Sequence, residues 1–249
     1  MKKILNYFVM GGLLFGFSDC GKDEESSTVT LLLRLSHFAG NKPLVGNQLV
    51  LKDSANQTFS VEKFDYYLSN IKLRNRETGD FFFEVNSYHL VRALNNPNNW
   101  EIILRNVPKK KFSEIELSIG VDNGANHSTD QIGDLDPTNF MAWDWTTGYK
   151  FLAISGKYKV APDSGNYVFH VGEDKNFKTL NFKFKDILST NFDIVKDGQI
   201  IMYADVSALF QSPNPVNFPV FNTAMASSEG SNKIADNYAS GFIKLVGAN

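Results

Sequence analysis

Hydrophobic and polar residues alternate with a period of two in many segments beyond residue 28. In residues 29–37 (VTLLLRLSH), every second side chain from Leu31 to His37 lies on one face, and the intervening ones, Arg34 among them, lie on the other. This alternation predicts a strand that is buried on one side. Further strands are predicted at 48–52, 59–74, 81–91, 101–104, 114–119, 149–160, 167–171, 179–184 and 199–204.

Short strands separated by Gly, Pro, Asn and Asp turns indicate an all-β fold, and we expect an antiparallel two-sheet β-sandwich. The 21 Phe residues would fill the space between the sheets. One or two short helices are expected near the C-terminus, at 205–210 and within 224–242. In the second, Ile234, Tyr238 and Phe242 recur at helical spacing, and a serine at 227, 228 or 231 would cap it.

The first twenty residues have the pattern of a secretory leader. A positive start, MKK, precedes an apolar run at 4–17 that is too short to span a bilayer comfortably. Cys20, the single cysteine, follows closely. We therefore expect residues 1–19 to be the signal peptide of a bacterial lipoprotein and Cys20 to carry the lipid, although Asp19 stands where a small residue is usual. A plain signal peptide with an incidental cysteine is the alternative.

The rest of the chain divides into a short tether and one domain. Residues 20–28 are polar and acidic, which predicts a flexible tether, and residues 29–249 are expected to form a single domain. A working signal places the protein in the cell envelope, with its lipid in the outer membrane. Acidic residues directly after the lipid cysteine resemble surface-export signals, so both the periplasmic and the outer face stay open.

Charge and cysteine content exclude several classes of function. The formal net charge is −2, which does not favour binding to nucleic acid. One cysteine excludes an internal disulfide framework and any Cys-rich zinc or iron–sulfur site. The chain has no HExxH motif, no nucleophile elbow and no glycine loop placed between a strand and a helix. We therefore do not expect an enzyme.

Residues 120–137 (GVDNGANHSTDQIGDLDP) form a long polar segment of the kind that is usually functional or mobile. It holds four carboxylates, Asp122, Asp130, Asp134 and Asp136. Carboxylate oxygens in a loop suit calcium, although their spacing matches no EF-hand. The alternative is a solvated loop held by local Asx turns.

Two tryptophans follow that loop in MAWDWTTGY. Trp143 and Trp145 are two residues apart, so on a strand both would project to one face. Three interpretations stay open for them: core aromatics, a platform on which a sugar stacks, or part of a metal site.

The metal interpretation depends on the histidines, of which there are four: His37, His89, His127 and His170. Imidazole is the commonest side-chain ligand of copper and zinc. His37 lies on the apolar face of its strand, and His170 ends an aromatic run. Taken alone, each is more typical of a hydrogen-bonded core histidine. His127 lies in the polar loop and needs no special explanation.

Several stretches together resemble the MbnP-like family of periplasmic or lipid-anchored copper-binding proteins related to methanobactin import, and the lipid-anchored branch in particular. The most specific is residues 133–137 (GDLDP) followed by 141–149 (MAWDWTTGY). The others are 37–44 (HFAGNKPL) with 59–73 (FSVEKFDYYLSNIKL), 120–122 (GVD), 169–172 (FHVG) and 234–237 (IADN).

This resemblance implies a β-sandwich that holds one copper ion. Characterised relatives bind copper with two histidines and a tryptophan oxidised to kynurenine by a di-haem partner of the MauG type. The motifs that match place His37, His170, Trp143 and Trp145 as the metal-site residues. Some relatives carry a cysteine pair near the second histidine motif, whereas no cysteine follows Gly172 here.

Three hypotheses follow. The first is a monomeric, lipid-anchored copper-binding protein that serves copper uptake or handling. The second is a surface adhesion lipoprotein that binds glycans or calcium through the Trp pair and the Asp-rich loop. In the third, these His and Trp residues pack the core and function lies in surfaces that bind partners.

Overall fold

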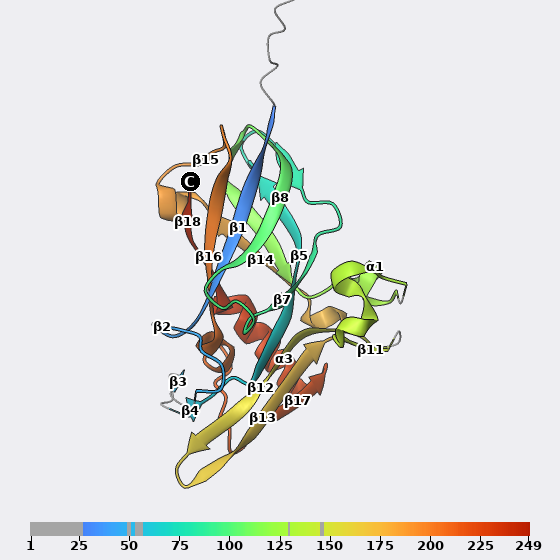
Figure 1. Ribbon diagram of the computed structural model, residues 1–249, viewed down its shortest axis with the longest axis vertical. Helices are drawn as coiled ribbons and strands as arrows, with labels where there is room; N and C mark the ends of the chain where they lie inside the picture. The colour runs from blue at the N-terminus through green and yellow to red at the C-terminus, as the bar shows by residue number, and fades with distance from the viewer. Residues whose placement is uncertain (1–26, 49–50, 53–56, 129, 145–146) are drawn as a thin grey trace, which may run out of the picture.

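The computed structural model of the protein describes residues 27–48, 51–52, 57–128, 130–144 and 147–249. Two curled sheets pack face to face along an elongated body, with the start of the first strand, β1 (Thr28–Ala39), at one end of the long axis (Figure 1). The predicted two-sheet sandwich is confirmed, and two strand pairs in it are parallel. The signal peptide and the lipidation site at Cys20 lie outside the described residues, and Thr28, the last residue of the predicted tether, already belongs to the first strand.

The smaller sheet is built around β1 (Thr28–Ala39). β1 pairs in parallel with β16 (Gly198–Asp205) on one side and antiparallel with β8 (Trp100–Pro108) on the other. Every second residue of β1 is buried, as its sequence pattern predicts. β2 (Lys42–Pro43) and β18 (Ile243–Ala248) complete this sheet.

The larger sheet has the order β14-β10-β5-β12-β13-β17. Its long central strands, β5 and β12, carry short strands along their edges and ends. The strands of this sheet are β3 (Leu51–Lys52), β4 (Thr58–Phe59), β5 (Lys63–Arg74), β6 (Phe81–Phe83), β7 (Tyr88–Arg92), β10 (Glu114–Ile119), β11 (Ala142–Asp144), β12 (Gly148–Val160), β13 (Asp163–Gly172), β14 (Lys178–Lys183) and β17 (Thr223–Ala226). A separate pair joins β9 (Lys111–Phe112) to β15 (Phe192–Asp193).

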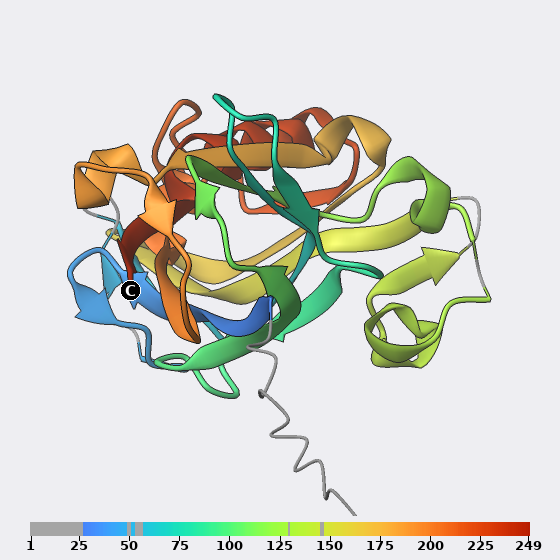
Figure 2. The same cartoon turned by 90° about the horizontal axis from the view of Figure 1, so that it is seen from above.

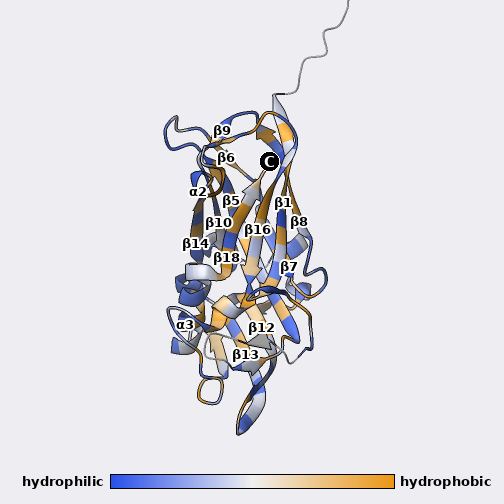
Figure 3. Ribbon diagram, turned by 90° about the vertical axis from the view of Figure 1, so that its left-hand side faces the viewer, coloured by the Kyte–Doolittle hydropathy of each residue, from blue (hydrophilic) through white to orange (hydrophobic). Residues whose placement is uncertain are grey.

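Aromatic side chains fill much of the space between the sheets. Phe59 and Phe210 meet edge to face with ring centroids 5.0 Å apart, and Tyr158 stacks on Phe218 at 5.5 Å. Such pairs add about 0.5–1.5 kcal/mol each beyond the area that they bury. Figure 3 shows the corresponding apolar stretches along the strands of both sheets.

Helical segments are short. The predicted helix at 205–210 is a 3-10 turn, η4 (Val206–Phe210), capped by Asp205. The predicted longer helix is α3 (Glu229–Asn237), capped by the Ser228 hydroxyl, which accepts from the Ser231 amide. The others are α1 (Asn123–Asn126), η1 (Gly133–Leu135), η2 (Pro137–Asn139), η3 (Asp174–Asn176), α2 (Lys185–Leu188) and the π-helical η5 (Tyr238–Phe242). Within the described part of the chain, none of the helices has the length and apolar character needed to cross a membrane.

A second, smaller core lies on the outer face of the larger sheet. It gathers Tyr67, Met141, Tyr149 and Phe151 beneath the polar segment that contains α1, η1 and η2. That segment projects from one side of the sandwich (Figure 2). The hydroxyls of Tyr67 and Tyr149 fasten it to the sheet by donating to the carbonyl oxygens of Asp134 and Leu135, at 2.8 and 2.5 Å. The polar loop is therefore held by aromatic side chains of the sheet.

Candidate functional site

His37 lies near the C-terminal end of β1, and its side chain points into the main core, toward the larger sheet. Its side chain is 0% exposed. Its Nε2 is 2.8 Å from the hydroxyl of Tyr66, and its Nδ1 is 3.1 Å from the carbonyl oxygen of Pro97. Phe64 packs against the ring edge to face. His37 is therefore built into the packing between the two sheets.

The partners of His37 fix its tautomer. A carbonyl oxygen only accepts, so Nδ1 carries the proton and donates it to Pro97. Nε2 then accepts from the Tyr66 hydroxyl, which occupies the one lone pair that a metal would need. Burial lowers the pKa of His37 to about 4, and the Pro97 contact raises it only in part, so the ring is neutral at pH 7.

His170 lies on the opposite side of the larger sheet. Its neighbours Phe169 and Val171 on β13 are buried in the main core, and alternation along the strand directs His170 outward. Its side chain is half-buried. Burial, followed by the positive charges of Lys150 and Lys63, lowers its pKa to about 4. Among the described residues, neither nitrogen of this ring has a hydrogen-bond partner.

The structure does not bring His37 and His170 together. His37 faces the space between the sheets, and His170 faces away from it, so the larger sheet lies between the two imidazoles. One metal ion held by both rings requires them within a few ångströms of each other, because metal–nitrogen bonds are about 2 Å long. The pairing implied by the family motifs is not assembled in this conformation.

Trp143 lies on the same outer face as His170. A Cβ added to Gly172 would fall 2.5 Å from Cζ3 of Trp143, so the indole rests directly on that glycine. Gly172 is two residues beyond His170 on the same strand, so the indole and the imidazole lie on the same face of the sheet. The Lys150 ammonium lies over the indole, 5.8 Å from the ring centroid. Trp145 lies outside the described residues.

Charged groups surround this part of the outer face. The Lys63 ammonium is 3.6 Å from the Asp65 carboxylate. Arg92 is the register partner of Asp65 on the neighbouring strand, β7. Burial raises the pKa of Asp65, and the charges of Lys63 and Arg92 oppose that shift. Burial, followed by the charge of Lys63, lowers the pKa of Lys150. The region is thus polar, partly desolvated and net positive.

His127 is a second imidazole tied to this outer-face region. Its Nε2 is 3.0 Å from Oδ2 of Asp174, two residues beyond the glycine under Trp143. Asn126 also donates to Asp174, at 2.8 Å, and its own side-chain oxygen accepts from the Tyr149 amide at 2.8 Å. A histidine held by a carboxylate at one nitrogen keeps the other free, the arrangement common at metal sites. The sequence alone assigned no role to His127. Its place in a long polar loop was nevertheless a signal, because such loops are usually functional or mobile.

The four loop carboxylates all accept hydrogen bonds from nearby protein groups. Asp122 accepts from the Tyr88 hydroxyl at 2.6 Å, and Asp134 accepts from the Leu90 amide at 2.8 Å. Asp136 caps η2 through the Thr138 amide, and Asp130 accepts from the Ser128 hydroxyl. Two of these contacts are local, as in Asx turns, and two fasten the loop to β7, so the carboxylates hold the loop in place and do not form a calcium cage.

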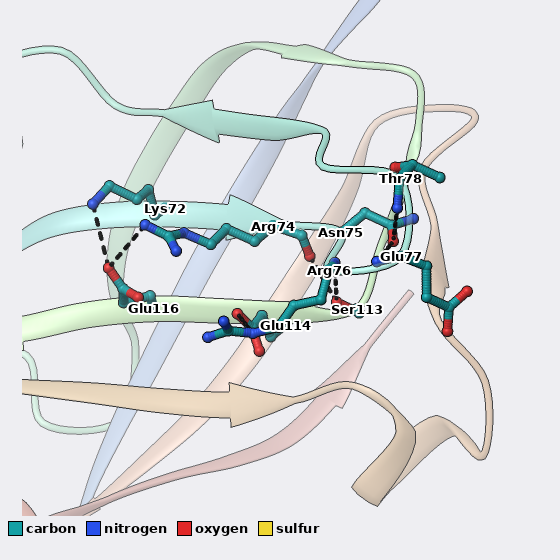
Figure 4. Close-up of polar contacts among 9 residues, drawn as sticks. All are labelled: Lys72, Arg74, Asn75, Arg76, Glu77, Thr78, Ser113, Glu114 and Glu116. Atoms are coloured by element: carbon teal, nitrogen blue, oxygen red, sulfur yellow. Dashed lines mark hydrogen bonds and ion pairs between the residues drawn. The ribbon is translucent and has the colours of Figure 1, made fainter.

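A polar cluster at the far end of the sandwich is an ion-pair network. A surface cavity of about 360 Å³ opens there between Lys72 and Phe81. The cations that line it are already paired with carboxylates of β10: Arg76 with Glu114 at 2.7 Å and Lys72 with Glu116 at 3.3 Å (Figure 4). We interpret this cluster as structural.

No preformed metal cage is present in the described residues: no three side chains of His, Cys, Asp or Glu gather there closely enough to hold an ion. Of the residues expected at a metal site, Trp143 and His170 share the outer face, with the indole over Gly172, two residues along β13 from His170. His127 pairs with Asp174 at the edge of this region and does not form one cluster with His170. A metal at this face would therefore need further donors of another type.

Comparisons with known proteins add a family. The model of a protein family named MbnP matches residues 28–228. Among solved structures, MbnP from Methylosinus trichosporium is similar with a TM-score of 0.55, covering 82% of each chain at 15% identity. At that identity the likeness concerns the fold alone. No curated protein matches.

Proposed function

The chain belongs to the MbnP family, and from that premise we propose that it is a copper-handling protein that binds its ion on the outer face of the larger sheet. The observation that carries this proposal is the position of His170 on the face of the sheet that also carries Trp143. The imidazole there is neutral, has no hydrogen-bond partner among the described residues and shares its face with an indole.

The donor types at this face fit copper. Imidazole nitrogen suits copper in both oxidation states, and it binds only when neutral, as the lowered pKa of His170 ensures at pH 7. His127, which Asp174 holds in the adjoining loop, is the candidate for a second imidazole, although it does not form one cluster with His170 in this conformation. His37 has its lone pair committed to Tyr66 in the core, so we assign it a structural role.

The tryptophan chemistry of the family is part of the same proposal. Indole nitrogen only donates, whereas the aniline nitrogen of kynurenine offers a lone pair to a metal. Oxidation of Trp143 by a di-haem partner would therefore add a nitrogen donor beside His170. The intact mass of the protein, measured after co-expression with such a partner, tests this step. We expect a mass change in the parent that is absent in Trp143→Phe.

We further propose a place in the cell envelope. The secretory pattern at 4–17 and the single cysteine at position 20 support export and a lipid anchor. A mass increase that is lost in Cys20→Ser would support the anchor. The glycan- or calcium-binding alternative stays a prediction.

Copper stoichiometry tests the proposed function. Purified protein is loaded with copper, freed of excess metal and analysed for copper per chain. We expect the parent to retain copper, His170→Ala to lose it, and His89→Ala to retain it. His89 is a suitable control because its imidazole is held by Glu84 at 2.8 Å, on β7. Equal retention in parent and His170→Ala would overturn the assignment of the site.

A further inference from the structure

Met225 lies directly beside His170 on the neighbouring strand. β17 pairs in parallel with β13, and in the register of that ladder Met225 is the partner of His170. Residues opposite each other in adjacent strands have their side chains on the same face of the sheet. The thioether and the imidazole are therefore lateral neighbours.

The burial pattern of β17 independently directs Met225 outward. Ala224, the residue before it, is buried in the main core together with Phe169. Met225 itself is 46% exposed, although methionine is usually a buried residue. It thus lies on the outer face with His170, two strands from Ala153 in the second core. No packing requirement in the described structure explains an exposed methionine at this position.

The donor atoms of Met225 and His170 favour one oxidation state of copper, Cu(I). Thioether sulfur is a soft donor that selects Cu(I) over harder cations, and imidazole accepts either valence of copper. The indole of Trp143 lies over Gly172, two residues along β13 from His170 and on the same face. The imidazole thus has a sulfur donor on the adjacent strand and shares its face with a polarisable aromatic ring.

The charges near the site favour the same oxidation state. Lys150 and Lys63 both act on His170, as the lowering of its pKa indicates, and so both repel a bound cation. Coulomb repulsion is proportional to the charge of the ion, so Cu(II) is opposed twice as strongly as Cu(I). A site near these two ammonium groups therefore binds the monovalent ion at the lower electrostatic cost.

We propose that Met225 is a copper ligand and that, with His170, it makes the outer-face site selective for Cu(I). This inference rests on the proposed function, because it assigns a further donor and a valence to the same site. It predicts that removing the sulfur weakens Cu(I) binding and leaves Cu(II) binding nearly unchanged.

Competition titration with a chromophoric Cu(I) chelator, under anaerobic conditions and in buffer without sulfur ligands, tests it. Met225→Leu removes the sulfur and keeps the size and hydrophobicity of the side chain. Met202→Leu is the matched control, because Met202 is fully buried in β16 on the other sheet. We expect Met225→Leu to weaken Cu(I) binding by about tenfold or more, and Met202→Leu to leave it unchanged. Cu(II) affinity should change less than about twofold in either variant.

A second measurement identifies the donor atom. Copper-edge X-ray absorption of the Cu(I)-loaded parent should contain a sulfur scatterer that is lost in Met225→Leu. Equal Cu(I) affinity in parent and Met225→Leu, or a sulfur scatterer present in both, would overturn the role of Met225 and leave the proposed function standing. A parent that binds neither valence of copper would instead overturn the proposed function, and the ligand assignment with it.

Discussion

The hydroxyl of Tyr66 donates a hydrogen bond to Nε2 of His37 across the interior of the sandwich, at 2.8 Å. The contact joins β1 of one sheet to β5 of the other. It requires a neutral His37, because a protonated ring has no lone pair to accept it.

This requirement predicts acid-sensitive stability. The pKa of His37 falls from 6.5 in the unfolded chain to about 4 in the folded protein, so the unfolded state binds more protons between these values. The resulting stabilisation, roughly 3 kcal/mol, is complete above pH 6.5, declines as the pH falls and is lost below about pH 4. Urea unfolding at pH 7 and pH 4.5 measures this loss.

His37→Phe is the matched variant for that measurement, since it fills the site and removes the titrating group. We expect it to be destabilised at pH 7 by about 1–3 kcal/mol, because Tyr66 loses its acceptor in the core. It should also lose less stability than the parent on going to pH 4.5. An equal loss in both proteins would show that His37 does not carry the effect.

Lys150→Met should raise the pKa of His170. The ammonium of Lys150 is one cause of the lowered pKa, after burial, so its removal moves the pKa back towards the ordinary value. It also removes a cation that lies over Trp143 and repels copper, so copper affinity should increase. NMR titration of the imidazole and copper titration follow the two effects. Lys157→Met, whose ammonium pairs with Glu62 at 2.9 Å, should change neither.

Gly172→Ala should displace the indole of Trp143. A Cβ at this position would lie 2.5 Å from the ring and 2.4 Å from the carbonyl oxygen of Tyr149, so the structure must shift to relieve both contacts. We expect a loss of about 1–3 kcal/mol in the free energy of unfolding and a changed tryptophan emission spectrum. Gly247→Ala is the control, because its added Cβ would meet nothing closer than 3.5 Å. Unchanged emission in Gly172→Ala would contradict the position given to Trp143.

Calcium should not stabilise the Asp-rich loop. Asp122, Asp134 and Asp136 already accept hydrogen bonds from nearby hydroxyl and amide groups. An ion that binds the folded state raises the Tm, so we expect the Tm in millimolar calcium and in chelator to agree within about 1 °C. A clear rise with calcium would restore the alternative function of this loop.

The sequence predicted the sandwich and most of its long strands, because period-two patterns mark half-buried strands. It correctly placed His37 among the inward-facing residues of β1. It missed β17 and the partnership of Met225 with His170, since parallel pairs join segments that are distant in sequence. It also joined residues 81–91 into one strand, whereas Asn86 turns the chain there with a φ of 53°.

The pairing of His37 with His170 could not be tested from the sequence. Alternation tells which residues of a strand share a face, but it does not tell whether that face meets the main core or a second one. The larger sheet is apolar on both faces near β12, because Phe151 and Ala153 pack under the loop while Leu152 packs in the main core. His170 belongs to the face that carries this second core and His37 to the main core, so the larger sheet separates the two histidines.

Copper bound per chain in three proteins tests the central claim most directly: the parent, His170→Ala and His37→Phe, each loaded in the same way and first verified to be folded. The account predicts that the parent and His37→Phe retain copper and that His170→Ala does not. Loss of copper in His37→Phe with retention in His170→Ala would contradict it and place the ion in the core, beside Tyr66.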